Sequence, residues 1–146
     1  MDRPRDPDEW RKAERSWYAG DKEEARRLFA WTVEHTSTTS LSPDFYLSQW
    51  AYLEATVGER ERFESLYSRA FSLEPNSPFL RLGYARILWT EFKDATACTV
   101  AIADLESLLA SDRWDRKNDL APLAYSQKIE TLRAWLRGEP GGPLWP

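Results

Sequence analysis

The fold is decided by the stretch Gly20-Asp21-Lys22-Glu23-Glu24-Ala25-Arg26-Arg27-Leu28-Phe29. Its glycine is suited to end one helix, its aspartate to cap the next, and its apolar residues recur at helical spacing. Similar residues return 38 positions later: Gly58 for Gly20, Leu66 for Leu28 and Tyr67 for Phe29. A second comparison, offset by 34 positions, places Phe79 on Phe45, Tyr84 on Trp50 and Ala85 on Ala51. The chain therefore contains a repeated helix–turn–helix unit.

Gly and Pro divide the rest of the chain into segments of helical length. No segment alternates with the period of a strand, and Asn-Gly and Asp-Gly hairpin turns are missing from the sequence, so the predicted fold is all-α. We expect seven helices. The first runs from Asp6-Pro7 to Ala19, the second starts after the cap Asp21, and the third runs from Ser42-Pro43 to Gly58. The fourth covers Phe63–Leu73 and ends before Pro75, the fifth starts at Ser77-Pro78, the sixth covers about 94–110, and the seventh runs from about 119 to 137.

A 34-residue period of paired helices is that of the tetratricopeptide repeat, and the quoted stretch resembles that family's turn and second helix. Leu73-Glu74-Pro75-Asn76-Ser77 resembles the end of a repeat, and the middle repeat is also similar to the half-a-tetratricopeptide variant. In the third repeat Phe92-Lys93 stands where the family has its turn glycine, and the helix that follows fits only with a one-residue insertion.

The resemblance covers about residues 6 to 110 and implies a short α-solenoid of about three antiparallel helix pairs. The seventh helix is polar on one side and is expected to be a C-terminal cap. We expect one domain over residues 1–137 and a flexible Gly/Pro-rich tail over 138–146, which carries Trp145.

The resemblance also implies which residues line the concave surface of the stack, because the first helix of each pair forms it in this family. The inward positions are Trp10, Glu14, Trp17, Phe45, Ser48, Tyr52, Phe79, Leu82, Arg86 and Trp89. Most of them are apolar or aromatic, and Trp, Tyr and Arg are the residue types that dominate binding energies at protein interfaces. The candidate protein-binding residues are Trp10, Glu14, Trp17, Phe45, Tyr52, Phe79, Arg86 and Trp89, and the competing interpretation makes several of these rings core.

Composition disfavours several other functions. The formal net charge is −4 and basic residues form no long run, so nucleic acid is not expected as a partner. A single Cys98 and a single His35 provide no zinc ligand set, and we expect no metal, cofactor or catalytic site. Cys98 is predicted to be a buried small hydrophobe and His35 a helix-terminal residue. The sequence shows neither a signal peptide nor an apolar run that could span a membrane, so a cytoplasmic protein is expected.

The expected function is that of a non-catalytic protein-binding module, an adaptor or assembly subunit with an aromatic-lined groove. Three alternatives stay open at this point. The acidic chain could be an immunity or antagonist protein that neutralises a basic toxin or enzyme through complementary charge. It could be a small helical enzyme, or it could act in RNA processing, as the half-a-tetratricopeptide likeness suggests. A second copy of the chain also stays open as the partner.

Overall fold

The computed structural model describes residues 8–35, 42–114 and 122–139, and all regular structure in these ranges is helical. The predicted cap by Asp6, the start of the last helix near residue 119 and the tail from residue 140 onwards, with Trp145, lie outside the described residues. The helices are α1 (Asp8–Tyr18), α2 (Lys22–Glu34), α3 (Pro43–Thr56), α4 (Arg60–Leu73), α5 (Pro78–Thr90), α6 (Ala95–Leu109) and α7 (Pro122–Leu136).

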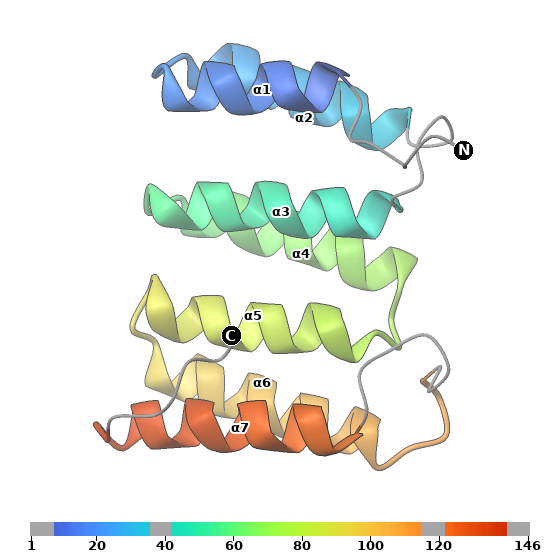
Figure 1. Cartoon of the computed structure of the whole chain (residues 1–146), viewed down its shortest axis with the longest axis vertical. Helices are drawn as coiled ribbons and strands as arrows, with labels where there is room; N and C mark the ends of the chain where they lie inside the picture. The colour runs from blue at the N-terminus through green and yellow to red at the C-terminus, as the bar shows by residue number, and fades with distance from the viewer. Residues whose placement is uncertain (1–7, 36–41, 115–121, 140–146) are drawn as a thin grey trace.

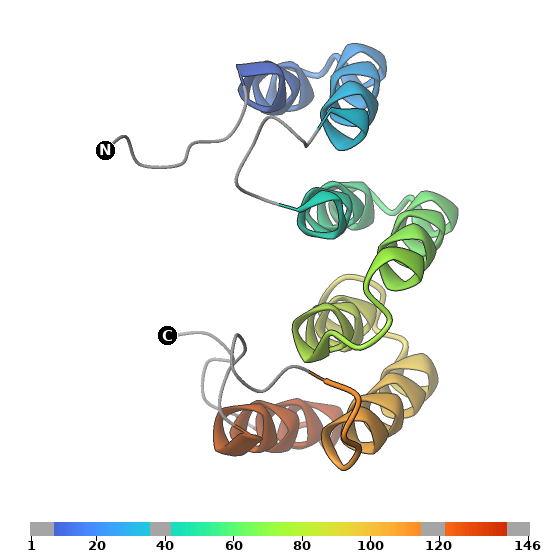
Figure 2. The same ribbon diagram turned by 90° about the vertical axis from the view of Figure 1, so that its right-hand side faces the viewer.

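The helices pack as antiparallel pairs that stack side by side along the long axis of the molecule (Figure 1). α1 packs with α2, α3 with α4 and α5 with α6, and α7 lies against α5 and α6 at the end of the stack. The stack is curved, with α1, α3 and α5 on its inner side and α2, α4 and α6 on its outer side (Figure 2). The predicted short α-solenoid with a capping helix is confirmed. None of the helices in these ranges combines the length and apolarity needed to cross a bilayer.

Left-handed glycines close the first two turns of the stack. Gly20 and Gly58 have φ of +95° and +78°, a region that glycine adopts without steric conflict. After each glycine, the next amide reaches back five residues, as in a Schellman motif; the amide of Glu59, for example, donates to the carbonyl of Glu54 at 3.0 Å. The repeated glycines of the sequence therefore mark a repeated backbone conformation.

The third turn also contains a residue with a left-handed backbone, but that residue is not glycine. Lys93 has φ of +52°, and the amide of Asp94 reaches back six residues to the carbonyl of Leu88, at 3.0 Å. The additional residue in this turn agrees with the one-residue insertion expected from the sequence. Asp94 then caps α6 by accepting from the amide of Ala97 at 3.0 Å, as Asp21 caps α2 by accepting from Glu24 at 3.2 Å.

α7 ends like the inner helices α1 and α3. Gly138 has φ of +76°, and the amide of Glu139 reaches back five residues to Ala134 at 2.9 Å. The buried side of α7 carries Tyr125, Ile129 and Leu132, whereas its other side is polar. α7 thus has the end geometry of a fourth inner helix and covers the apolar surface of the third pair.

Aromatic rings fill the spaces between successive pairs. Trp10 of α1 lies 4.8 Å from Tyr46 of α3, between ring centroids, and Phe63 of α4 stacks on Tyr84 of α5 at 5.5 Å. Such ring pairs add specific geometry to the burial of their large apolar surface. The high aromatic content of the chain is explained mainly by this core.

A buried ion pair joins the first two helix pairs. The Glu54 carboxylate of α3 is fully buried and accepts two hydrogen bonds from the Arg26 guanidinium of α2, at 2.8 and 2.7 Å. It also accepts one from the indole nitrogen of Trp50 at 3.0 Å. These three hydrogen bonds satisfy a carboxylate that would be very unfavourable if it were unpaired away from water.

Two aliphatic residues at the ends of helices are exposed. Val57 is 44% and Leu73 is 53% exposed. Val57 follows the last residue of α3 and Leu73 is the last residue of α4, so both lie where the helix leaves the core. The 3.6-residue period predicts the buried face only while the helix continues.

Candidate functional site on the inner face of α3 and α5

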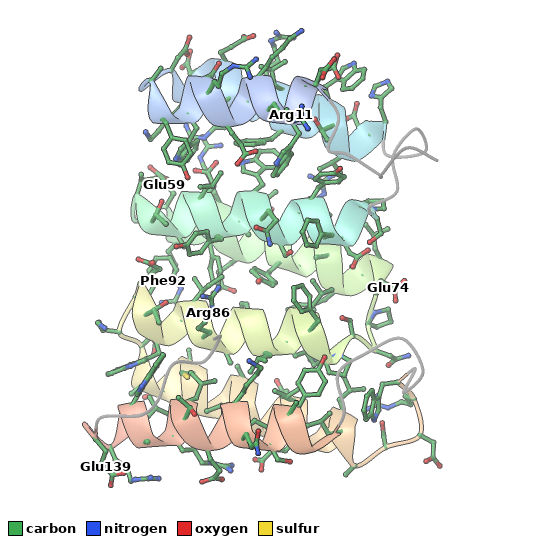
Figure 3. All side chains as sticks on the ribbon, viewed as in Figure 1. Arg11, Glu59, Glu74, Arg86, Phe92 and Glu139 are labelled. Carbon is green, nitrogen blue, oxygen red and sulfur yellow. The ribbon has the colours of Figure 1, made fainter. Side chains whose placement is uncertain are left out.

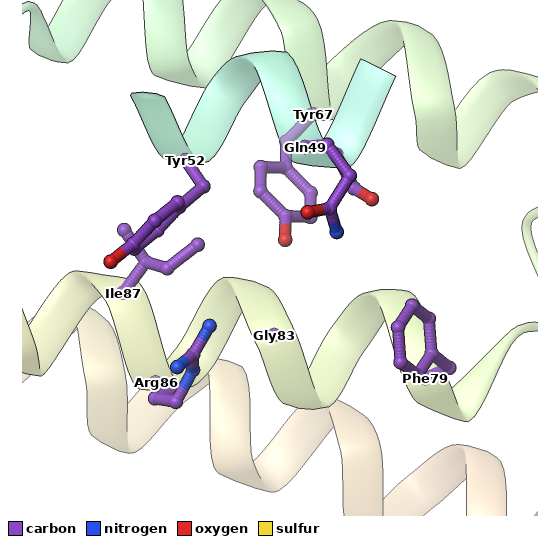
Figure 4. Close-up of a pocket in the computed structure, with 8 residues that line it drawn as sticks. Gln49, Tyr52, Tyr67, Phe79, Gly83, Arg86 and Ile87 are labelled. Carbon is purple, nitrogen blue, oxygen red and sulfur yellow. The ribbon is translucent and has the colours of Figure 1, made fainter. Parts of the chain in front are cut away.

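The inner face of the stack contains two neighbouring hollows. One, of about 230 Å³, lies between α1 and α3, and the other, of about 300 Å³, lies between α3 and α5. Gln49 and Tyr52 of α3 line both hollows and form the ridge between them. The described residues that line the second hollow are Ser48, Gln49, Tyr52, Tyr67, Phe79, Gly83, Arg86 and Ile87 (Figure 4).

The missing side chain of Gly83 lets a residue from an outer helix reach the second hollow. A β-carbon at position 83 would lie 2.9 Å from the hydroxyl oxygen of Tyr67, closer than atoms of this kind approach without displacement. Because the site has no side chain, the Tyr67 ring of α4 extends between α3 and α5 with its hydroxyl directed at α5 (Figure 4). A residue of an outer helix thereby contributes a polar atom to the inner face.

The Tyr67 hydroxyl is neutral at ordinary pH. Burial raises the pKa of Tyr67 above its usual range, and the Arg86 guanidinium nearby opposes this shift only in part. A neutral phenol can both donate and accept a hydrogen bond. Within the described residues this hydroxyl makes no hydrogen bond to the protein.

Arg86 supplies the positive charge of the second hollow. Its guanidinium lies 5.7 Å from the centroid of the Tyr52 ring across the hollow, within the range of a cation–π contact. Figure 3 places Arg86 in the middle of the inner face, on α5. The guanidinium, a positively charged group, therefore forms part of one wall of the hollow.

The structure separates the predicted binding residues into two groups. Tyr52, Phe79 and Arg86 meet at the second hollow, where Phe79 is 40% exposed, and Glu14 and Phe45 line the first. Of the remaining predicted residues, Trp10 and Trp17 are buried, and Trp89 is half-buried and lines neither hollow.

Trp10 and Trp17 are each only 4% exposed, so they belong to the core, although Trp10 also reaches the edge of the first hollow. Trp89 is half-buried and lies under the ammonium of Lys93, at 4.9 Å. Of the other inward positions, Leu82 is buried, and Ser48 is buried with its hydroxyl donating to the carbonyl of Phe45 at 2.7 Å.

Six residues that line the two hollows were not predicted from the sequence, and these are Tyr18, Gln49, Leu53, Tyr67, Gly83 and Ile87. Gln49 immediately precedes Trp50, and the helical period alone does not show which residues of α3 form the ridge between the two hollows. Tyr67 belongs to a second helix, which the repeat pattern assigns to the outer layer. Gly83 did carry a signal, because glycine inside a helix often marks a close approach. Tyr18, 75% exposed beside the first hollow, is the last residue of α1.

The single cysteine and histidine have structural surroundings. Cys98 is buried within α6, and burial raises the pKa of its thiol to about 11, so the reactive thiolate is scarce. His35 follows α2 as its C-terminal cap, where Nδ1 lies 2.8 Å from the carbonyl of Trp31 and the ring stacks on the Trp31 ring. In the ranges that the structure describes, no group of His, Cys, Asp and Glu is arranged to hold a metal ion.

Comparisons with protein-family models, curated proteins and solved structures found no match. The likeness to the tetratricopeptide repeat therefore rests on the spacing of residues in this chain.

Proposed function

We propose that the chain is a tetratricopeptide-like, non-catalytic protein-binding module, an adaptor or assembly subunit of the cytoplasm, which binds a segment of another protein on its inner face. The observation that carries the proposal is the meeting of Tyr52, Phe79 and Arg86 around one hollow. These residues come from two helix pairs, and all three remain partly accessible. Tyr and Arg are the types most often found as binding hot spots, and Phe79 offers exposed apolar surface beside them.

Charge at the inner face argues against the antagonist of a basic protein. Such a partner would be matched by carboxylates at the contact surface. Among the described residues that line the two hollows, Glu14 is the one acid, and it lies in the first hollow, away from Arg86. The overall charge of −4 is carried elsewhere on the molecule.

The test is a selection of phage-displayed random linear peptides on the immobilised protein, followed by affinity measurements on variants. We expect Tyr52→Ala and Phe79→Ala each to weaken the recovered peptides about tenfold or more, since truncating a hot-spot residue costs about 2 kcal/mol. Leu73→Ala is the control, because Leu73 is an exposed apolar residue of the outer helix α4. Circular dichroism checks that each variant is folded.

Recovered peptides that bind both inner-face variants normally, or that lose affinity only in Leu73→Ala, would overturn the proposal. A selection that recovers no peptide dependent on the inner face would count against it equally.

A further inference from the structure

The charged residue in the lining of the second hollow is positive. Of the described residues that line it, Arg86 alone is charged, and the Tyr67 hydroxyl and the Gln49 amide add neutral hydrogen-bonding groups. A guanidinium presents its N–H donors in a planar fork that matches both oxygens of a carboxylate. A basic side chain in this hollow would instead meet a like charge.

Tyr67 provides a second, independent indication of a ligand. Tyr67 is only 3% exposed, yet its hydroxyl is directed into the hollow and, among the described residues, has no hydrogen-bond partner in the protein. The hydroxyl oxygen is not among the described buried atoms that lack a partner, so a molecule that enters the hollow can reach it. A carboxylate held by Arg86 would supply an acceptor for it.

The distance between the charged and apolar parts of the hollow restricts the ligand. Phe79 and Arg86 are seven residues apart on α5, which is about 10.5 Å along the helix axis at about 1.5 Å per residue. In an extended polyproline-type segment, side chains three residues apart share a face and are separated by about 9.3 Å. The two separations agree to about 1 Å.

An extended segment that inserts only its side chains is compatible with a hollow of about 300 Å³.

We propose that the second hollow binds an extended segment of a partner protein in which an acidic side chain pairs with Arg86 and Tyr67, while an aromatic side chain three residues away packs on Phe79. This proposal rests on the proposed function and specifies the chemistry of its partner. The carboxylate belongs to a side chain within the segment, not to the end of a chain.

The test uses short synthetic peptides with both ends blocked, so that one glutamate supplies the only carboxylate. The probes contain Glu-Pro-Pro-Phe or Phe-Pro-Pro-Glu between Gly-Ser flanks, because proline favours the required extended conformation. Matched peptides carry Gln or Lys in place of Glu, and binding is measured by fluorescence anisotropy with an uncharged dye. We expect at least one Glu peptide to bind about tenfold more tightly than its Gln form, as a charge-assisted hydrogen bond would require.

Variants of the protein assign this preference to the hollow. Arg86→Glu should reverse it, so that the Lys peptide binds better than the Glu peptide, while Arg69→Glu should leave it unchanged. Arg69 is an exposed arginine of the outer helix α4, so both variants change the net charge equally. Arg86→Gln serves as the second variant if Arg86→Glu does not fold, and should remove the preference for Glu over Gln. Tyr67→Phe should weaken the Glu peptide about threefold and the Gln peptide much less.

Several results would overturn the proposal. If the Glu and Gln peptides bind equally well, and both lose affinity in Tyr52→Ala and Phe79→Ala, the acidic ligand is refuted while the protein-binding function stands. Peptide binding that is unchanged in all of these inner-face variants would refute both the acidic ligand and the protein-binding function. Self-association of the wild type that Arg86→Glu abolishes would identify a second copy as the occupant, and a tenfold gain in affinity in Trp145→Ala would identify the chain's own tail.

Discussion

Removing Arg26 should destabilise the protein far more than its position near the surface suggests. In Arg26→Met the Glu54 carboxylate keeps only the Trp50 indole as a donor and stays fully buried, since its side chain is 0% exposed. Breaking a buried ion pair in this way costs about 3–5 kcal/mol. That loss is a large fraction of the stability of a typical domain, about 5–15 kcal/mol.

The reverse substitution should cost less. In Glu54→Leu the Arg26 side chain, which is already 20% exposed, can turn its guanidinium into water, so the expected loss is about 1–3 kcal/mol. The double variant Arg26→Met/Glu54→Leu replaces the ion pair with apolar side chains and should lie within about 2 kcal/mol of the wild type. The two substitutions are therefore expected to be strongly non-additive.

Urea denaturation followed by circular dichroism measures these free energies of unfolding. Arg27→Met is the matched control, because Arg27 lies next to Arg26 and pairs with Glu24 on the exposed side of α2. This control should lose less than about 1 kcal/mol. If Arg26→Met were no more harmful than Arg27→Met, the reasoning that Glu54 depends on Arg26 in a water-excluded site would be refuted.

Three further outcomes follow from individual residues. Gly83→Ala should lower the melting temperature of the wild-type protein, because the added β-carbon meets the Tyr67 hydroxyl. In the Tyr67→Phe protein, which lacks that hydroxyl, the same substitution should stabilise the fold by about 0.5–1 kcal/mol. Stabilisation in both proteins would contradict the contact. Lys93→Gly should stabilise by about 1 kcal/mol in urea denaturation, because Lys93 holds a left-handed conformation that glycine adopts without strain; a loss of stability would contradict this. Cys98 should react with a thiol reagent at pH 8 only after unfolding, because burial raises the pKa of its thiol to about 11, and rapid labelling of the native protein would show an accessible thiolate.

The repeat pattern predicted the fold well because turns and caps are local. Gly20 and Gly58 were recognised as turn residues and have the same left-handed backbone, and Asp21 caps α2 as expected. At the third turn the sequence indicated a one-residue insertion but not the backbone conformation that accommodates it. The strain that Lys93 accepts depends on the packing of α5 and α6, which no local pattern contains.

The site was predicted only in part, because position in a repeat fixes the direction of a side chain but not its depth. Tyr52 and Arg86 were assigned to the inner face and line its second hollow. Trp10 and Trp17 were assigned to the same face, yet both are buried against Phe29 of α2, and Trp10 also contacts Tyr46 of α3. Tyr67 could not be found from the pattern at all, because it reaches the hollow only through the space that Gly83 leaves.

The most direct test of the account is a map of amide chemical shifts as the wild-type protein is titrated with a peptide recovered from the phage selection. A partner segment seated between α3 and α5 should produce its largest shifts at Gln49, Tyr52, Gly83 and Arg86, and leave Val100 on the outer helix α6 unchanged. Shifts that cluster around Val100 and the outer helices, with the residues of the second hollow unaffected, would contradict the claim that the inner face is the binding surface.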